Sequence, residues 1–202
     1  PILLVQPEVI PVENPGAVKT ALERIRTSGR QDITKVLHER MVVEEAKVKA
    51  LRDMAYDAID RGESVMAFFN FTDPLRNFAG ELGCEYIDGS TPPAERKEIL
   101  ERFNKADSAR VLAVNNQAAA EGIDAHDTNG VPRLGLHSPP WCARTALQCI
   151  GRTHRVGGRS RAVHKFLFAA DTIEERVMKT MLAKAGNIAA LTDADLTLPE
   201  TL

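Results

Sequence analysis

The chain has 202 residues, a formal net charge of −2 and 44% hydrophobic residues, which is the profile of a soluble globular protein. No apolar run approaches the ~18 residues of a membrane span, and the amino end lacks the basic start of a signal peptide. The three cysteines are odd in number and match no metal-ligand spacing. A reducing intracellular setting (cytoplasm, nucleoid or nucleus) without a metal site is therefore favoured over a disulfide framework. The chain begins with Pro1, which is typical of a fragment or a processed product.

The first third of the chain predicts an extended lead-in followed by helices. Four prolines within residues 1–16 favour an irregular or extended segment. Helical patterns follow near residues 17–27 and 31–41, and an apolar stripe at helical spacing predicts a longer helix over residues 44–60. Gly62 lies just past the end of that helix, where a glycine commonly stops one.

Beyond this point, strands and helices alternate. Strands are predicted over residues 64–71, 84–88, 110–116, 133–138 and 163–169, and helices over residues 72–83, 90–104, 145–157 and 171–186. Alternation at this short spacing predicts βαβ units, and hence an α/β fold whose parallel sheet is covered by helices on both faces. In such sheets, ligands bind beyond the carboxyl ends of the strands.

Local signals mark several helix starts. Asp73 is a candidate cap before Pro74, Thr91 and two prolines open the next helix, and Thr172 with Glu175 forms a capping box. The chain is expected to comprise a proline-rich lead-in and helical extension (1–43), an α/β domain (44–190) and a tail (191–202).

Charge is distributed unevenly along the chain. From residue 128 to residue 170 there is no acidic residue, and the basic residues there are Arg133, Arg144, Arg152, Arg155, Arg159, Arg161 and Lys165. The rest of the chain carries 19 basic and 28 acidic residues, a balance of −9. A basic block in an acidic protein indicates an anionic partner such as phosphate or nucleic acid, or else a solvated basic surface.

The segment QCIGRTHRVGG (148–158) lies within this basic block. In a helix it would place Gln148, Arg152 and Arg155 on one face, at positions i, i+4 and i+7, with no carboxylate in the segment. Guanidinium groups capture phosphate in a planar, bidentate manner, and they are costly inside a cleft unless an anion pairs with them. The segment therefore predicts a phosphate ligand for arginines that the protein itself leaves unpaired.

Four segments together carry a family resemblance: VMAFFNFTDPLRNFAGEL (65–82), YIDGSTPPAERKEILERFN (86–104), RVLAVNNQAAAEGID (110–124) and SPPWCARTALQCIGRTHRVGG (138–158). Their order and spacing resemble the second RecA-like domain of superfamily-two helicases, in particular the Swi/Snf-type DNA translocases. The resemblance covers about residues 44–182. It implies a RecA-like parallel sheet with helices on both faces, preceded here by the helical extension.

The resemblance implies roles at the nucleotide. Arg152 and Arg155 match the two arginines of the family's last motif, which would reach the γ-phosphate of ATP bound on a first RecA-like domain. Gln148 matches the glutamine that leads this motif and helps to place the nucleotide. Gly122 and Asp124 match the loop that couples nucleotide state to the grip on nucleic acid. Asp124 is the helicase-type residue, whereas Swi/Snf-type proteins usually have asparagine there.

The resemblance also implies nucleic-acid contacts. Ser90 and Thr91 match a loop near the nucleic-acid backbone, and Trp141 matches the tryptophan that follows the fourth strand in the Swi/Snf group. Asn116 stands where the family usually has a threonine that touches phosphate. Gly158 replaces the usual Swi/Snf glutamine, a departure that bears on the subfamily.

The chain has no G-x-x-x-x-G-K-[ST] phosphate loop and no Asp-Glu pair ending a strand, so ATP and Mg²⁺ would be bound mainly by a first domain. The resemblance thus implies the carboxy-terminal motor domain of an ATP-dependent DNA helicase or translocase, without ATPase activity of its own. Duplex DNA is favoured by the Swi/Snf features, and RNA stays open. The alternative is a stand-alone nucleic-acid-binding module that has this fold but no motor partner.

Overall fold

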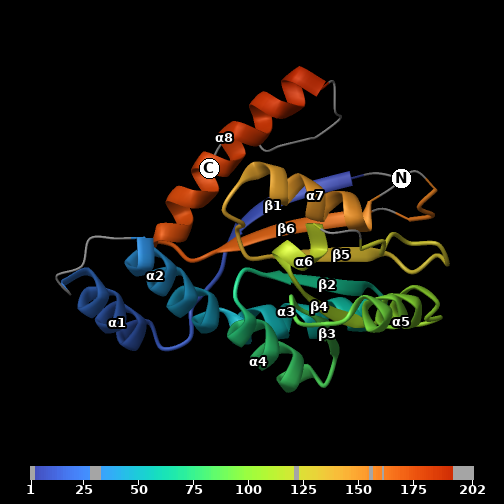
Figure 1. Ribbon diagram of the computed structural model, residues 1–202, viewed down its shortest axis with the longest axis horizontal. Helices are drawn as coiled ribbons and strands as arrows, with labels where there is room; N and C mark the ends of the chain where they lie inside the picture. The colour runs from blue at the N-terminus through green and yellow to red at the C-terminus, as the bar shows by residue number, and fades with distance from the viewer. Residues whose placement is uncertain (1–2, 28–32, 121–122, 155–156, 161, 193–202) are drawn as a thin grey trace.

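A computed structural model describes residues 3–27, 33–120, 123–154, 157–160 and 162–192. Its centre is a six-stranded sheet whose neighbouring strands run parallel, in the order β1-β6-β5-β2-β4-β3 (Figure 1). The strands are β1 (Leu3–Val9), β2 (Ser64–Phe69), β3 (Glu85–Ile87), β4 (Val111–Asn115), β5 (Arg133–His137) and β6 (Ala162–Phe168). The predicted parallel sheet is confirmed.

The helices are α1 (Pro15–Thr27), α2 (Ile33–Ala46), α3 (Val48–Asp60), α4 (Thr72–Leu82), α5 (Pro93–Asn104), α6 (Asn116–Ala120), α7 (Ala143–Thr153) and α8 (Ile173–Thr192). Apolar side chains of α3 and α4 form one core with the sheet, and those of α5, α6 and α7 form another. A third cluster joins α7 and α8 to β6. Each strand–helix pair predicted after residue 63 is therefore present, with ends shifted by a few residues.

The central strand β2 shows why both faces need helices. Val65, Ala67 and Phe69 point into the core with α3 and α4, whereas Met66 and Phe68 point into the core with α5, α6 and α7. Side chains alternate between the faces of a strand, so a continuous apolar run is required when both faces are buried. The predicted helical cover on both faces is confirmed.

The lead-in was expected to be irregular or extended, and part of it is an extended strand. Residues 3–9 form β1 and pair in parallel with residues 162–168 of β6. β1 is an edge strand, where Pro7 is tolerated because only one side of the strand has to form ladder hydrogen bonds. Pro7 therefore lies in an extended edge strand, whereas Pro11 follows it in irregular backbone and Pro15 begins α1.

The helices expected near residues 31–41 and over residues 44–60 are both present as α2 and α3, but the boundary between them falls later than expected, at Lys47. α2 ends at Ala46, α3 begins at Val48, and Lys47 lies between them. The Lys47 N–H donates to the Glu44 carbonyl over 3.2 Å, three residues back instead of four, which tightens the chain locally. The Lys47 side chain is fully buried and binds distant elements, so tertiary contacts override the helical pattern here.

The predicted cap of α4 is wrong, because no side chain within the segment caps this helix. Glu44 of α2 acts instead of Asp73. Its Oε1 accepts the backbone N–H groups of Asn70 (2.8 Å) and Phe71 (2.9 Å), just before the helix begins. At the start of α5, Thr91 also makes no cap, since its hydroxyl accepts the Asp88 N–H over 3.0 Å.

The two residues of the predicted capping box do act at the start of α8, but with shifted partners. Thr172 Oγ1 accepts the N–H of Glu174 over 3.2 Å, and the Glu175 carboxylate accepts the N–H of Asp171 over 3.1 Å. Asp171 has a φ of 59°, so the chain turns sharply before the helix and moves each donor by one position.

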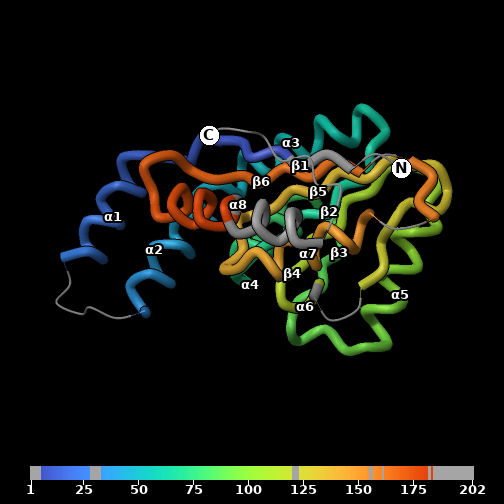
Figure 2. The backbone as a smooth tube through the Cα atoms, turned by 90° about the horizontal axis from the view of Figure 1, so that it is seen from above, coloured from blue at the N-terminus to red at the C-terminus, as the bar shows by residue number. Residues whose placement is uncertain are grey.

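Helices α1 and α2 lie together at one end of the molecule, beyond the sheet (Figures 1 and 2). Val18 and Leu22 of α1 pack with Val43 of α2 and with Ala169, which follows β6. The expected helical extension is present, while the division into parts at residues 43/44 and 190/191 stays a prediction. In the part of the chain that the structure describes, no helix has the length and apolarity to cross a bilayer.

Candidate functional site

One of the predicted loops meets the end of α7. The backbone N–H of Ala125 donates to the carbonyl of Arg152 over 2.9 Å. This bond ties the segment that follows α6, which contains Asp124, to the last turn of α7. The two segments are far apart in sequence, and they meet near the start of β5, because the Ala125 carbonyl also accepts Nε of Arg133.

Helix α7 is amphipathic. Its buried residues recur at helical spacing, and they are Ala143, Ala146, Cys149, Ile150 and Thr153. On the other side of the helix, Gln148 is exposed and Arg152 is half-buried, one turn further along. Arg155 lies outside the described residues, and so does Gly122.

Arg152 does not match the expectation of an unpaired guanidinium. Arg152 interacts with another group of the chain, and its positive charge acts on the neighbouring Cys149 thiol. Burial raises the pKa of Cys149 to about 12, and Arg152 acts against that rise. The Cys149 thiol is therefore a core group, packed under the face that carries Arg152.

Asp124 keeps an accessible carboxylate on a fixed backbone. Its Oδ1 lies 2.5 Å from Nδ1 of His126, and 47% of the side chain is exposed. The Asp124 carbonyl accepts Nδ2 of Asn104 over 2.7 Å, which ties the loop to α5. A cleft of about 580 Å³ separates α5 from this loop, with Arg96 and Lys97 in its lining. Both charge signs thus line a solvent-facing hollow between α5 and the segment that contains Asp124.

The loop after β3 is organised around the Asp88 carboxylate. The N–H and the hydroxyl of Ser90 donate to Oδ1 of Asp88 over 2.8 and 2.6 Å, and Arg76 pairs with Oδ2 at 2.8 Å. Burial acts to raise the pKa of Asp88, but these hydrogen bonds and the ion pair outweigh it, so this pKa is lowered. Ser90 is exposed and Thr91 is buried. The loop is therefore preformed, with Ser90 at its surface.

Asn116 is placed inside the protein. It is 3% exposed, its Nδ2 donates to Oδ1 of Asn70 over 2.9 Å, and its Oδ1 lies 3.5 Å from Sγ of Cys149. Both ends of its amide are therefore engaged. A nucleic-acid contact by Asn116 stays a prediction, and this placement does not favour it.

Trp141 stands at the surface beyond β5. It is 48% exposed, and the guanidinium carbon of Arg40 lies 4.0 Å from its ring centroid. Arg40 belongs to α2 and has no local sequence signal that links it to Trp141. Sequence reasoning therefore identified the tryptophan but missed the cation beneath it.

The basic block is not one continuous basic surface. Arg133 is 2% exposed, donates to the carbonyls of Ala125 and Val131, and lies over the ring of Phe103 at 4.9 Å. Lys165 pairs with Glu8 of β1 at 2.9 Å. These two cations stabilise the fold, so the charge that faces solvent is smaller than the sequence suggests.

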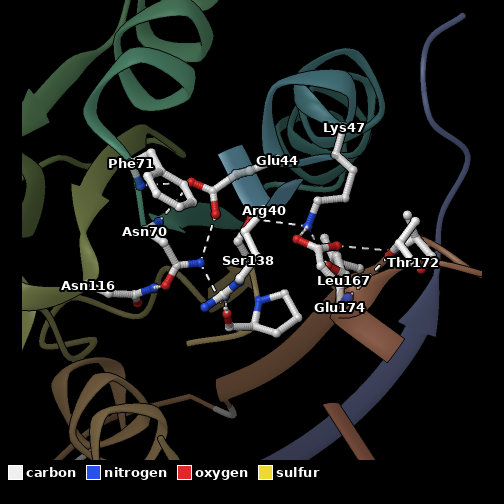
Figure 3. A network of polar contacts seen from close by, with 12 residues as sticks. Arg40, Glu44, Lys47, Asn70, Phe71, Asn116, Ser138, Leu167, Thr172 and Glu174 are labelled. Atoms are coloured by element: carbon white, nitrogen blue, oxygen red, sulfur yellow. Dashed lines mark hydrogen bonds and ion pairs between the residues drawn. The ribbon is translucent and has the colours of Figure 1, made fainter. Parts of the chain in front are cut away.

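A buried polar network lies at the carboxyl ends of β2, β5 and β6, and it was also missed by sequence reasoning (Figure 3). Its labelled members are Arg40, Glu44, Lys47, Asn70, Phe71, Asn116, Ser138, Leu167, Thr172 and Glu174. Burial raises the pKa of Glu44, while Lys47 and hydrogen bonds from Phe71 and Asn70 act to lower it. The network joins α2, α6, α8 and the ends of β2, β5 and β6.

A second buried chain of polar groups supports α7 from below. Nε2 of His137 lies 2.7 Å from Nδ1 of His164, whose Nε2 lies 2.8 Å from Oγ1 of Thr153. Gly135 leaves room for this pair, because a Cβ there would lie 2.5 Å from His164 and 2.7 Å from His137. The last turn of α7 is therefore held by a hydrogen-bond chain from β5 and β6.

Among the described ranges, no three His, Cys, Asp or Glu side chains lie close enough together to hold a metal ion. Burial lowers the pKa of His137 well below its usual range, and it lowers that of His164 to about 3. These two imidazoles are neutral, internal groups.

Comparison with known proteins gives the family. Residues 46–157, more than half of the chain, match the family described as the helicase conserved C-terminal domain. A protein of Acanthamoeba polyphaga mimivirus that carries the name of an ATP-dependent RNA helicase is 26% identical over 178 residues, which is 87% of this chain and 33% of the relative. The human SWI/SNF-related matrix-associated actin-dependent regulator of chromatin subfamily A member 1 is 29% identical over 148 residues, 70% of this chain and 14% of the relative.

The fold has a solved counterpart. The Sulfolobus solfataricus SWI2/SNF2 ATPase core in complex with dsDNA superposes with a TM-score of 0.64 at 19% identity, covering 96% of this chain and 47% of that one. This likeness confirms the RecA-like fold. The chain spans a third or less of the length of the two curated relatives named above. The chain belongs to the helicase conserved C-terminal domain family, with Swi/Snf-type helicases among its relatives.

Proposed function

We propose that the chain is the carboxy-terminal motor domain of an ATP-dependent DNA helicase or translocase. A first RecA-like domain binds ATP and Mg²⁺, and this chain closes against it. Water attacks the γ-phosphate, and Arg152 and Arg155 stabilise the charge that develops on the transferring phosphoryl group. Gln148 orients the nucleotide from the same face of α7.

The bond between Ala125 and Arg152 is the observation that carries this proposal. This hydrogen bond, with an N···O distance of 2.9 Å, links the segment that contains Asp124 directly to α7. When ATP binding or hydrolysis shifts the position of Arg152, the segment that contains Asp124 moves with it. This is the coupling that a motor needs between its nucleotide site and its grip on nucleic acid.

Duplex DNA is the proposed nucleic-acid partner. The solved counterpart is a SWI2/SNF2 core in complex with dsDNA, which supports duplex DNA, while the mimiviral relative carries the name of an RNA helicase. Ser90 and Trp141 are exposed on loops at the carboxyl edge of the sheet. Contacts to the phosphate backbone would dominate, so binding is independent of sequence. We place this activity inside the cell.

The test is Arg152→Ala in a protein that carries this chain behind a first RecA-like domain. We expect a loss of DNA-stimulated ATP turnover of roughly 10³–10⁵, as for other arginine fingers. Nucleotide affinity should change little, because the charge arises mainly in the transition state. Arg152→Lys should rescue poorly, since an ammonium does not reproduce the planar guanidinium.

Arg24→Ala is the control, because Arg24 is an exposed arginine on α1, outside the basic block of residues 128–170. Turnover and melting temperature are measured on the same preparations. If Arg152→Ala lowers the melting temperature but keeps full turnover per folded molecule, Arg152 only braces α7 and the finger assignment is wrong.

A further inference from the structure

We propose that Arg40 is a positioning residue for Trp141, which it holds in the exposed orientation that meets the DNA duplex. The proposal rests on the proposed nucleic-acid role of Trp141. Arg40 lies in α2, outside the residues 46–157 that match the helicase family. The helical extension would thus contribute to DNA binding from beneath the contact surface.

The geometry of the pair is that of a cation stacked on an aromatic ring. The guanidinium carbon of Arg40 lies 4.0 Å from the centroid of the Trp141 ring. Arg40 is 0% exposed, whereas Trp141 is 48% exposed. The cation therefore covers the inner face of the indole and leaves the rest of the ring open to a ligand.

The loop that carries Trp141 is anchored through the same arginine. Nη2 of Arg40 donates to the carbonyl of Pro139, which also accepts Nδ2 of Asn70 over 3.1 Å. Pro139 and Pro140 are buried, and their rings restrict the backbone just before the tryptophan. Arg40 thus holds both the backbone and the ring of this loop.

A purely structural ion pair does not explain the burial of Arg40, because its guanidinium does not donate a hydrogen bond to the nearby Glu44 carboxylate. Glu44 is one turn along the same helix, yet its carboxylate accepts N–H groups of Asn70 and Phe71. Among the residues that the structure describes, Nε and Nη1 of Arg40 have no hydrogen-bond partner. Burial lowers the pKa of Arg40, with Glu174 and Glu44 acting against it. Stacking on the electron-rich face of an indole is the remaining compensation for this buried cation.

Holding Trp141 in advance has a consequence for binding. A side chain that is already fixed loses less conformational freedom when it meets its ligand. Arg40 therefore raises affinity for the duplex without touching it. A variant that frees the ring should bind more weakly even though every contacting residue is intact.

Trp141 is the single tryptophan of the chain, so its fluorescence reports this ring alone. The variants are Arg40→Met, which removes the charge, and Arg40→Lys, which keeps the charge but not the planar stack. Glu44→Gln is the matched control, because it perturbs the same helix and the same network without contacting the indole. Each 202-residue chain is examined by acrylamide quenching and by titration with a mixed-sequence DNA duplex at low salt.

We expect Arg40→Met to increase quenching of Trp141 in the free protein and to weaken duplex binding roughly three- to tenfold, in line with one lost cation–π contact. Arg40→Lys should fall between wild type and Arg40→Met, and it remains readable if Arg40→Met does not fold. Glu44→Gln should lower the melting temperature while leaving quenching and duplex affinity unchanged. If both Arg40 variants leave quenching unchanged, or if Glu44→Gln weakens binding as much as they do, the proposal is wrong.

Trp141→Ala separates this proposal from the proposed function. It should weaken duplex binding by itself, and adding Arg40→Met to it should have no further effect. If Trp141→Ala binds the duplex like wild type, the DNA contact of Trp141 is overturned, and the role of Arg40 in binding falls with it. If Trp141→Ala binds weakly and Arg40→Met weakens it further by the same factor as in wild type, only the positioning role is overturned.

Discussion

Lys47 and Glu174 form an ion pair of 2.8 Å in which both side chains are completely buried. Lys47 joins α2 to α3, and Glu174 lies in the first turn of α8. The same ammonium donates to the carbonyl of Leu167 over 2.9 Å and contacts Oγ of Ser138 at 3.3 Å. One side chain thus fixes α8 and the ends of β5 and β6 beneath the candidate site.

Removing one partner of this pair should be strongly destabilising. Lys47→Met leaves the Glu174 carboxylate buried without its cation, and breaking a buried pair in this way costs about 3–5 kcal/mol. Urea denaturation of wild type and variant measures the free energy of unfolding. Lys47→Met combined with Glu174→Gln should recover a large part of the loss, because no uncompensated charge remains. Equal losses for the single and the double variant would contradict this assignment.

Glu44→Gln is expected to destabilise the protein by about 1–3 kcal/mol although it preserves shape, because it leaves a buried polar group unsatisfied. Oε2 of Glu44 accepts Nδ2 of Asn70 over 2.7 Å, and an amide nitrogen there would face another donor. Asn70 is not free to flip, since its Oδ1 accepts Nδ2 of Asn116 over 2.9 Å. Thermal unfolding checks the loss. As a control, the exposed Glu45→Gln should change stability little, and a similar loss at both positions would contradict the argument.

The order of strands and helices was predictable because a strand that is buried on both faces needs a continuous apolar run, which is easy to recognise in a sequence. The run from Val65 to Phe69 is apolar throughout, as a central parallel strand must be. The break at Lys47 was not predictable. The Leu167 carbonyl that binds its ammonium lies 120 residues later, and local periodicity carries no trace of such a contact. The cap of α4 failed for the same reason, since Glu44 is 26 residues before Asn70.

The sequence predicted the relative positions of site residues only where those residues lie on the same helix, because helical spacing then decides which of them share a face. Gln148 and Arg152 are four residues apart in α7, so their shared face follows from helical geometry. The partnership of Arg40 with Trp141 depends on how α2 packs under the loop after β5, and no spacing rule links them. The burial of Asn116 likewise follows from its amide bonding to Asn70 on a neighbouring strand end.

The isolated chain should not hydrolyse ATP. It contains no phosphate loop, so the lysine and the backbone N–H groups that hold the β- and γ-phosphates are missing from this sequence. A coupled ATPase assay with and without DNA checks this. Turnover that rises in proportion to the concentration of chain, and that survives further purification, would contradict the expectation.

DNA binding by the chain should be weak, independent of sequence and sensitive to salt. Arg144 and Arg159 are exposed in the block without acidic residues, whereas Arg133 is buried and does not contribute. Phosphate neutralisation releases counterions, so the logarithm of affinity should fall linearly with the logarithm of salt concentration. Titration of two unrelated duplexes at several salt concentrations measures the slope. Tight binding to one sequence that salt does not change would rule the idea out.

The pair of His137 and His164 makes stability depend on pH. Burial lowers the pKa of His164 to about 3, with the charge of His154 acting in the same direction, and His137 is lowered by burial and by His164. In the unfolded chain a histidine takes up a proton near pH 6.5. Between these values the unfolded state binds more protons than the folded state, so the folded state loses stability as pH falls below about 6.5.

His164→Asn tests this source of pH dependence. The amide does not titrate, so the loss of stability between about pH 7.5 and pH 5 should be smaller in the variant than in wild type. At pH 7.5 the variant itself should be less stable, because the contacts with His137 and Thr153 are disturbed. His38→Asn, at an exposed position of α2, is the matched control and should keep the wild-type slope. Urea denaturation at closely spaced pH values gives the slopes, and an unchanged slope for His164→Asn would show that the buried pair is not its cause.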